Sequence, residues 1–138
     1  MRATLLAASL VILSAVPAAA QELDCSEPFG GAVRLACAGE FLAEADAELN
    51  RAYSAARDQA RRFDAVRKTN SGKPLADLLL AGQRRWLGFR DASCLAEGEA
   101  LTGNAREAIA SETDCKTRLT RDRTEALRTF ASRVRGVL

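Results

Sequence analysis

Apolar residues recur at helical spacing in three segments of the chain. In residues 38–68, Leu42, Leu49, Ala56 and Phe63 follow one another every seven residues. A repeat of this kind places apolar side chains on one stripe of an α-helix, opposite a charged face. The pattern therefore predicts a long first helix whose stripe faces a core.

A second helix is predicted over residues 74–97, after the break formed by residues 69–74, where Gly72 and Pro74 disfavour helix continuation. Its stripe consists of Leu75, Leu79, Trp86, Phe89 and Ser93. Gly82 and Gly88 interrupt this helix, and we expect each to mark a close contact between helices.

A third long helix is predicted over residues 113–134, where apolar residues such as Leu119, Leu127 and Phe130 follow 3–4 spacing. Between the second and third helices we expect a loop over 98–104 and a short separate helix over 105–110. Short connections favour antiparallel neighbours. The predicted fold is therefore all-α, a disulfide-stapled antiparallel helical hairpin or three-helix bundle.

Composition narrows the function classes. The 138 residues include 20 Lys and Arg, 18 Asp and Glu, four Cys and no His. Without His, Ser-His-Asp and Cys-His catalysis and His-ligated zinc are excluded. A net charge of +2 provides no global drive toward nucleic acid. No EF-hand loop is present, and we expect neither a metal nor a cofactor.

The N-terminus predicts export. Residues 1–20 combine Arg2, an apolar stretch from Leu5 to Val16 and the small residues Ala18–Ala20. This is typical of a cleaved signal peptide, and the apolar stretch is too short to span a bilayer. A retained membrane anchor is the alternative. We expect a single domain over 21–138, periplasmic or secreted, with no transmembrane segment.

Four cysteines in an exported chain predict disulfides. Cys25, Cys37, Cys94 and Cys115 contain no CxxC spacing, which argues against a redox site or a zinc knuckle. Four cysteines allow three pairings. We favour Cys25–Cys37 and Cys94–Cys115 because each closes a short local loop.

Polar residues also follow helical spacing. Asp46, Leu49, Asn50 and Tyr53 lie on one face of the first helix. The carboxylate and amide there could bond to polar groups of neighbouring helices. The candidates are Gln83, Arg90 and Arg123, beside the single tryptophan, Trp86, and the adjacent Asp91. A buried network that sets helix register is the structural interpretation. A ligand-binding cluster is the functional alternative.

Charge alternates along the chain in four blocks. The net charge is −6 over residues 22–50, +6 over 51–93, −4 over 94–115 and +5 over 116–138. In an up-down-up bundle both acidic blocks meet at the cysteine end. An acidic end could steer a cationic protein partner. The candidate partner-binding residues are Glu97, Glu99, Glu107, Glu112 and Asp114.

The ordered motif C…C…aDaeLNraY…L…Q..W..fRDasC…C….LT..R…L runs from Cys25 to Leu127. It resembles the lysozyme inhibitor LprI-like N-terminal domain family. The resemblance implies a small exported helical domain that binds a protein, in some members a lysozyme, without being an enzyme.

Two other functions stay open at this stage. One is an envelope structural or chaperone-like interaction module, suggested by the helical bundle and segregated charge. The other is a small cell-wall enzyme using paired carboxylates. The basic end of the bundle could also contact anionic lipid head groups.

Overall fold

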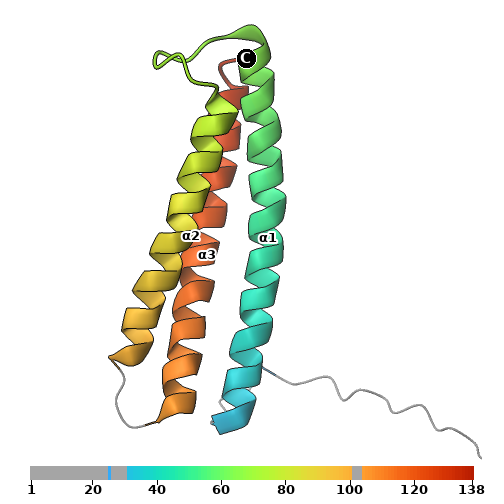
Figure 1. Cartoon of the computed structure of the whole chain (residues 1–138). Helices are drawn as coiled ribbons and strands as arrows, with labels where there is room; N and C mark the ends of the chain where they lie inside the picture. Colours follow the sequence, from blue (N-terminus) through green and yellow to red (C-terminus); the bar gives the residue numbers. More distant parts are fainter. Residues whose placement is uncertain (1–24, 26–30, 101–103) are drawn as a thin grey trace, which may run out of the picture.

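The computed structural model describes residue 25 and residues 31–100 and 104–138, which form three α-helices (Figure 1). They are α1 (Gly31–Val66), α2 (Leu75–Glu99) and α3 (Ala105–Arg135). The chain runs up α1, down α2 and up α3, so that α1 and α3 are parallel and α2 is antiparallel to both. The predicted all-α bundle is confirmed. The predicted signal peptide, residues 1–20, lies outside the described residues.

The core is built mainly from small side chains. The buried stripe of α1 is five alanines with Cys37 and Leu49: Ala38, Ala45, Ala52, Ala56 and Ala60. Alanine lets two helix backbones approach closely, and α1 packs most extensively on α3, where Leu127 and Ala131 are buried. Helix α2 covers this pair with fewer buried residues, notably Leu79 and Gln83. The principal interface therefore joins the first and third helices.

Two helix boundaries differ from the sequence prediction. Helix α1 begins at Gly31, seven residues before the predicted start, so Cys37 lies inside the helix. Residues 105–135 form one helix, and the predicted separate helix over 105–110 is wrong. The Asn104 side chain accepts a hydrogen bond from the Arg106 N–H at 3.0 Å and caps this helix. No Gly or Pro in residues 105–135 interrupts it.

The connection between α1 and α2 has two anchors. Gly72 adopts a φ of +72°, a conformation that favours glycine, and its N–H donates to the Thr69 carbonyl at 3.0 Å. At the start of α2, the Leu75 and Ala76 N–H groups donate to the two Asp64 carboxylate oxygens at 2.6 and 3.0 Å. The N-cap residue Pro74 has no side chain that can accept these hydrogen bonds. Asp64 of α1 takes this role, so a side chain of one helix caps the next helix.

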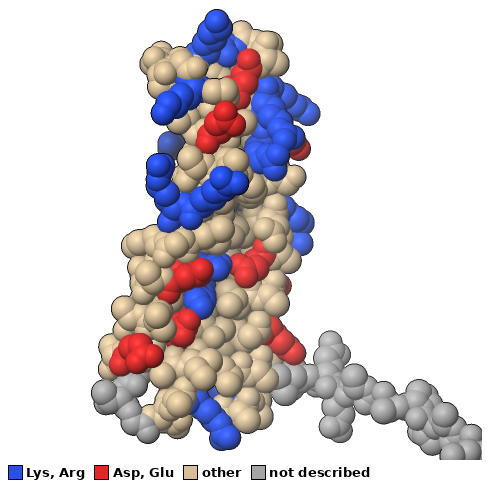
Figure 2. Space-filling model, viewed as in Figure 1, with Lys and Arg blue, Asp and Glu red and all other residues tan. Residues whose placement is uncertain are grey.

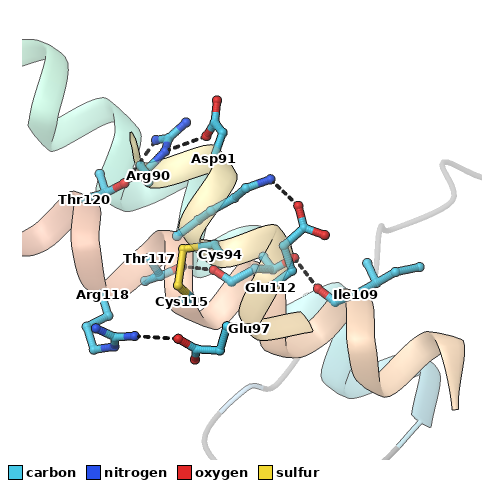
Figure 3. The surroundings of a disulfide bond; sticks show 12 residues. Arg90, Asp91, Cys94, Glu97, Ile109, Glu112, Cys115, Thr117, Arg118 and Thr120 are labelled. Atoms are coloured by element: carbon cyan, nitrogen blue, oxygen red, sulfur yellow. Dashed lines mark hydrogen bonds and ion pairs between the residues drawn. A yellow bond between two sulfur atoms is a disulfide. The ribbon is translucent and has the colours of Figure 1, made fainter. Parts of the chain in front are cut away.

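The predicted disulfides Cys25–Cys37 and Cys94–Cys115 are both confirmed. The second joins α2 to α3 in the interior, since Cys94 and Cys115 are buried (Figure 3). One turn after Cys94, Gly98 lies so close to α3 that an added Cβ would meet the Ala108 carbonyl oxygen at 2.8 Å.

The prediction that Gly82 and Gly88 mark close helix contacts is wrong. An added Cβ at either glycine would have no neighbour within 4 Å. The glycine that permits close approach is Gly98, which the sequence placed in a loop. None of the described helices is long and apolar enough to span a membrane.

Candidate functional site

A polar cluster joins all three helices at mid-height. Arg90 of α2 donates through Nη1 to Asp46 of α1 at 3.0 Å and to the Thr120 hydroxyl of α3 at 3.1 Å. Its Nε donates to Asp91 at 2.9 Å. Figure 3 shows Arg90 directed toward Thr120, with Asp91 exposed beside it. One mostly buried guanidinium therefore links α1, α2 and α3.

A second arginine, Arg123 of α3, extends this cluster to other residues of α2. Arg123 donates through Nε to the buried Gln83 side-chain oxygen of α2 at 3.0 Å. The guanidinium groups of Arg90 and Arg123 lie over the Trp86 ring, 5.4 and 5.9 Å from its centroid. Such cation–π contacts are favourable. Burial lowers the pKa of Arg123 from its ordinary value, but the group stays protonated at neutral pH.

The remaining predicted cluster residues lie in an open groove between α1 and α2. Tyr53 packs against the core, and its hydroxyl is buried without a hydrogen-bond partner among the described residues. Asn50 is exposed and makes no side-chain hydrogen bond within the described chain. The groove has a volume of about 340 Å³, and its lining includes Leu80 and Leu87 of α2. Asp46, Gln83 and Arg90 of the interhelical network line the same groove, so the network and the groove share one surface.

The five acidic candidates lie at the disulfide end of the bundle, defined as residues 31–40, 91–100 and 104–118. Four of them form ion pairs within the chain. Arg34 pairs with Asp114 at 2.8 Å and Glu107 at 3.3 Å. The other two pairs are Lys116–Glu112 at 2.6 Å and Arg118–Glu97 at 3.1 Å. Glu99 is exposed and has no ion pair within the described residues.

Charge is polarised along the bundle, as Figure 2 shows on one face. Because Arg90 bonds to both Asp46 and Thr120, these three residues lie at the same height along the bundle. This height divides the bundle into two halves. Residues 51–85 and 125–138 form the half nearer the α1–α2 connection, with 12 Lys and Arg against four Asp and Glu. The other described residues carry seven Lys and Arg against 11 Asp and Glu. The disulfide half is acidic and the connection half strongly basic.

The described residues contain no group of three or more Cys, Asp or Glu arranged to hold a metal ion. The arrangement offers two oppositely charged ends and a groove between α1 and α2. The fold defines a small disulfide-stapled three-helix domain.

Comparison with known proteins assigns the family. The sequence model of the family described as "Lysozyme inhibitor LprI" matches residues 25–127, so the chain belongs to this family. An uncharacterized protein of Rhizobium meliloti (strain 1021) is 33% identical over 141 residues, covering 93% of this chain and 94% of that protein. No solved structure matches the chain.

Sequence reasoning missed two residues of this architecture. Thr120 belongs to the quoted motif, but its role as an acceptor for Arg90 appears only when α3 is placed beside α2. Asp64 caps a helix that starts 11 residues later, and no local capping pattern points to it. A conventional cap lies next to the helix that it serves.

Proposed function

We propose that this protein is an exported, non-enzymatic inhibitor that binds a lysozyme and occludes its substrate site. The family match over residues 25–127 carries this proposal, because the family is described as lysozyme inhibitor LprI. The two disulfides support export, since such bonds persist in oxidising compartments. The periplasm or the outside of the cell is the proposed location.

The acidic disulfide end is the proposed docking surface. Lysozymes are commonly basic, so an acidic surface would accelerate encounter and orient the complex. The acidic side chains of Arg34–Asp114, Arg34–Glu107 and Arg118–Glu97 are about half exposed. Exposed pairs of this kind contribute only ~0–1 kcal/mol, so a cationic partner can replace Arg34 or Arg118 at little cost. The carboxylates are therefore available although they are paired.

The network around Arg90 has a positioning role in this proposal. The Arg90 guanidinium donates to Asp46 of α1 and to the Thr120 hydroxyl of α3, and these interhelical bonds support a structural role. The network instead holds α2 against α1 and α3, so that the acidic end presents a fixed shape. A preorganised surface loses less entropy on binding.

The test is lysis of cell-wall substrate by a panel of lysozymes, with the oxidised chain from Gln21 added. The proposal expects slower lysis with at least one lysozyme and a stoichiometric complex with the same enzyme by size-exclusion chromatography. Protein with both disulfides reduced is the control for the folded state. Full lysis and no complex with any lysozyme at high micromolar concentration would remove the proposal.

A second candidate function is an envelope interaction module with another protein partner. It is favoured by apolar side chains that α2 leaves in solvent, since Phe89 is 59% exposed and Leu78 is 40% exposed. The sequence placed Phe89 on the core stripe, and that placement is wrong. Cross-linking and co-purification from the native envelope separate the two functions, because the module would retain an endogenous envelope protein and no lysozyme.

A further inference from the structure

The connection end of the bundle, defined as residues 61–75 and 133–138, is crowded with unpaired positive charge. It carries seven exposed basic side chains, and none of them forms an ion pair within the described residues. They are Arg61, Arg62, Arg67, Lys68, Lys73, Arg133 and Arg135. At the disulfide end, Arg34, Lys116 and Arg118 are paired with carboxylates, and Arg106 is the one basic residue without an ion pair within the described residues.

Helix electrostatics explain only part of this cluster. Arg133 and Arg135 lie in the last turn of α3, where cations stabilise the negative end of the helix dipole. Arg67, Lys68 and Lys73 lie between α1 and α2, outside both helices. Arg67 and Lys68 directly follow the C-terminus of α1, where the dipole also favours cations, whereas Lys73 precedes the N-cap of α2, where it disfavours them. Helix stability therefore does not account for Lys73 or for the gathering of all three charges around one hollow.

These three residues surround a hollow of about 360 Å³. The one acidic residue in its lining is Asp64, whose two carboxylate oxygens accept the N–H groups of Leu75 and Ala76. The carboxylate is thus occupied by the start of α2 and forms no ion pair with Arg67, Lys68 or Lys73. The hollow is therefore a cationic site whose one carboxylate is already engaged by the backbone.

Apolar side chains are exposed at the same end. Val66 is 69% exposed, and Val137 and Leu138 are each 49% exposed. Figure 1 shows the end of α1 and the end of α3 next to each other at this tip. Apolar side chains ringed by Lys and Arg are the pattern of surfaces that enter the head-group region of a membrane.

We propose that the connection end docks on an anionic phospholipid bilayer. Arg67, Lys68 and Lys73 contact lipid phosphates, and Val66 and Val137 enter the head-group region. Only the tip of the bundle touches the lipid, so the acidic disulfide end points away from the membrane. The inference goes beyond the proposed inhibitor function and does not depend on it, since lipid binding uses the opposite end of the molecule.

The experiment is sedimentation of the oxidised chain from Gln21 with vesicles, either 40% phosphatidylglycerol in phosphatidylcholine or phosphatidylcholine alone. Partitioning onto the anionic vesicles is expected, with a steep decrease as salt rises from 50 to 300 mM. Little partitioning onto neutral vesicles is expected. Absence of binding to the anionic vesicles at 50 mM salt would overturn the proposal.

The decisive variant is R67Q/K68Q/K73Q, which removes the three connection charges. Each basic residue near an anionic surface strengthens binding roughly fivefold, so the triple variant is expected to bind about a hundredfold more weakly. The matched control is R106Q/R118Q/R121Q, which makes the same change in net charge with three exposed residues elsewhere. Equal losses in the two triple variants would overturn the proposal, because net charge alone would then account for binding.

Two further measurements separate lipid docking from capture of free phosphate and from loss of the fold. Inorganic phosphate added at constant ionic strength should not displace the chain from vesicles, and displacement would show a soluble-phosphate site in place of a docking surface. Circular dichroism should show unchanged helicity in both triple variants. R67Q/K68Q/K73Q should inhibit lysozyme as the parent does, so failure of lipid docking and failure of the inhibitor function remain distinguishable.

Discussion

At the scale of single residues, one arginine decides how three helices meet. Arg90 is largely buried, and its Nη1 donates hydrogen bonds to Asp46 of α1 and to Thr120 of α3. The Thr120 side chain is fully buried, so its hydroxyl has no access to water as a replacement partner. A buried polar group without a partner costs ~1–3 kcal/mol. Loss of Arg90 would therefore destabilise the bundle mainly by leaving the buried Thr120 hydroxyl without this hydrogen-bond partner.

Replacing Arg90 by Met should lower the free energy of unfolding by about 2–3 kcal/mol, because it removes both interhelical bonds and the contact over Trp86 while keeping a similar volume. Urea unfolding followed by circular dichroism measures this change. Asp91→Asn is the control, since the Asp91 side chain is 55% exposed and its pair with Arg90 should contribute at most ~1 kcal/mol. Equal stability of R90M and the parent would contradict the role of the network.

At the scale of elements, the packing between helices depends on small residues at two places. The alanine stripe of α1 brings α1 close to α3, and Gly98 brings the end of α2 close to α3 beside the Cys94–Cys115 bond. Helix α2 is otherwise lightly packed, and Asp64 holds its start from α1. The two ends of α2 are therefore attached by contacts additional to the Arg90 network at its middle.

Gly98→Ala should destabilise the bundle by about 1–3 kcal/mol, because the new Cβ would lie 2.8 Å from the Ala108 carbonyl oxygen and 3.1 Å from the Glu112 Cβ. The control is Gly88→Ala, which adds a Cβ with no neighbour within 4 Å. That exposed helical position should gain roughly 0.5–1 kcal/mol from higher helix propensity. Thermal unfolding of the two variants should shift in opposite directions, and a shift in the same direction would refute the close contact.

Asp64→Ala should cost about 1–2 kcal/mol, because the Leu75 and Ala76 N–H groups lose their acceptor at the start of α2. Amide hydrogen exchange should show faster exchange in the first turn of α2 specifically. Asp58→Ala removes an exposed carboxylate earlier in α1 and should leave that exchange unchanged. Similar exchange in both variants would indicate that Asp64 is not the cap.

At the scale of the whole molecule, near-neutrality conceals a polarised charge distribution. The chain carries 20 basic and 18 acidic residues, yet the connection half is strongly basic and the disulfide half acidic (Figure 2). A partner therefore experiences different fields at the two ends within about one Debye length of the surface. The two proposed contacts, a cationic protein and an anionic membrane, match opposite ends.

For a lysozyme bound through the acidic end, E97Q/E99Q/E107Q should lower the association rate constant about tenfold at low salt, because it removes the steering charge. The effect should nearly disappear at 500 mM salt. Stopped-flow or surface-binding kinetics measure both. The control variant D58N/D77N/D122N makes the same charge change with exposed carboxylates elsewhere, and an equal loss of rate there would place docking away from the disulfide end.

Three amphipathic segments and the charge polarity could be predicted from the sequence, because helical period and connection length are local properties. Loop closure favoured the two disulfide pairs among three possible pairings, and the structure confirms them. The sequence placed Arg90 and Asp46 on facing stripes but did not identify Thr120 as the third partner. Three features became visible only in the folded chain: α1 and α3 pack most extensively, Gly98 is the contact glycine, and Asp64 caps α2. Each of these features depends on which residues distant in sequence come within a few ångströms of one another. Periodicity along one helix shows which face is buried, but not which residues of another helix pack against it.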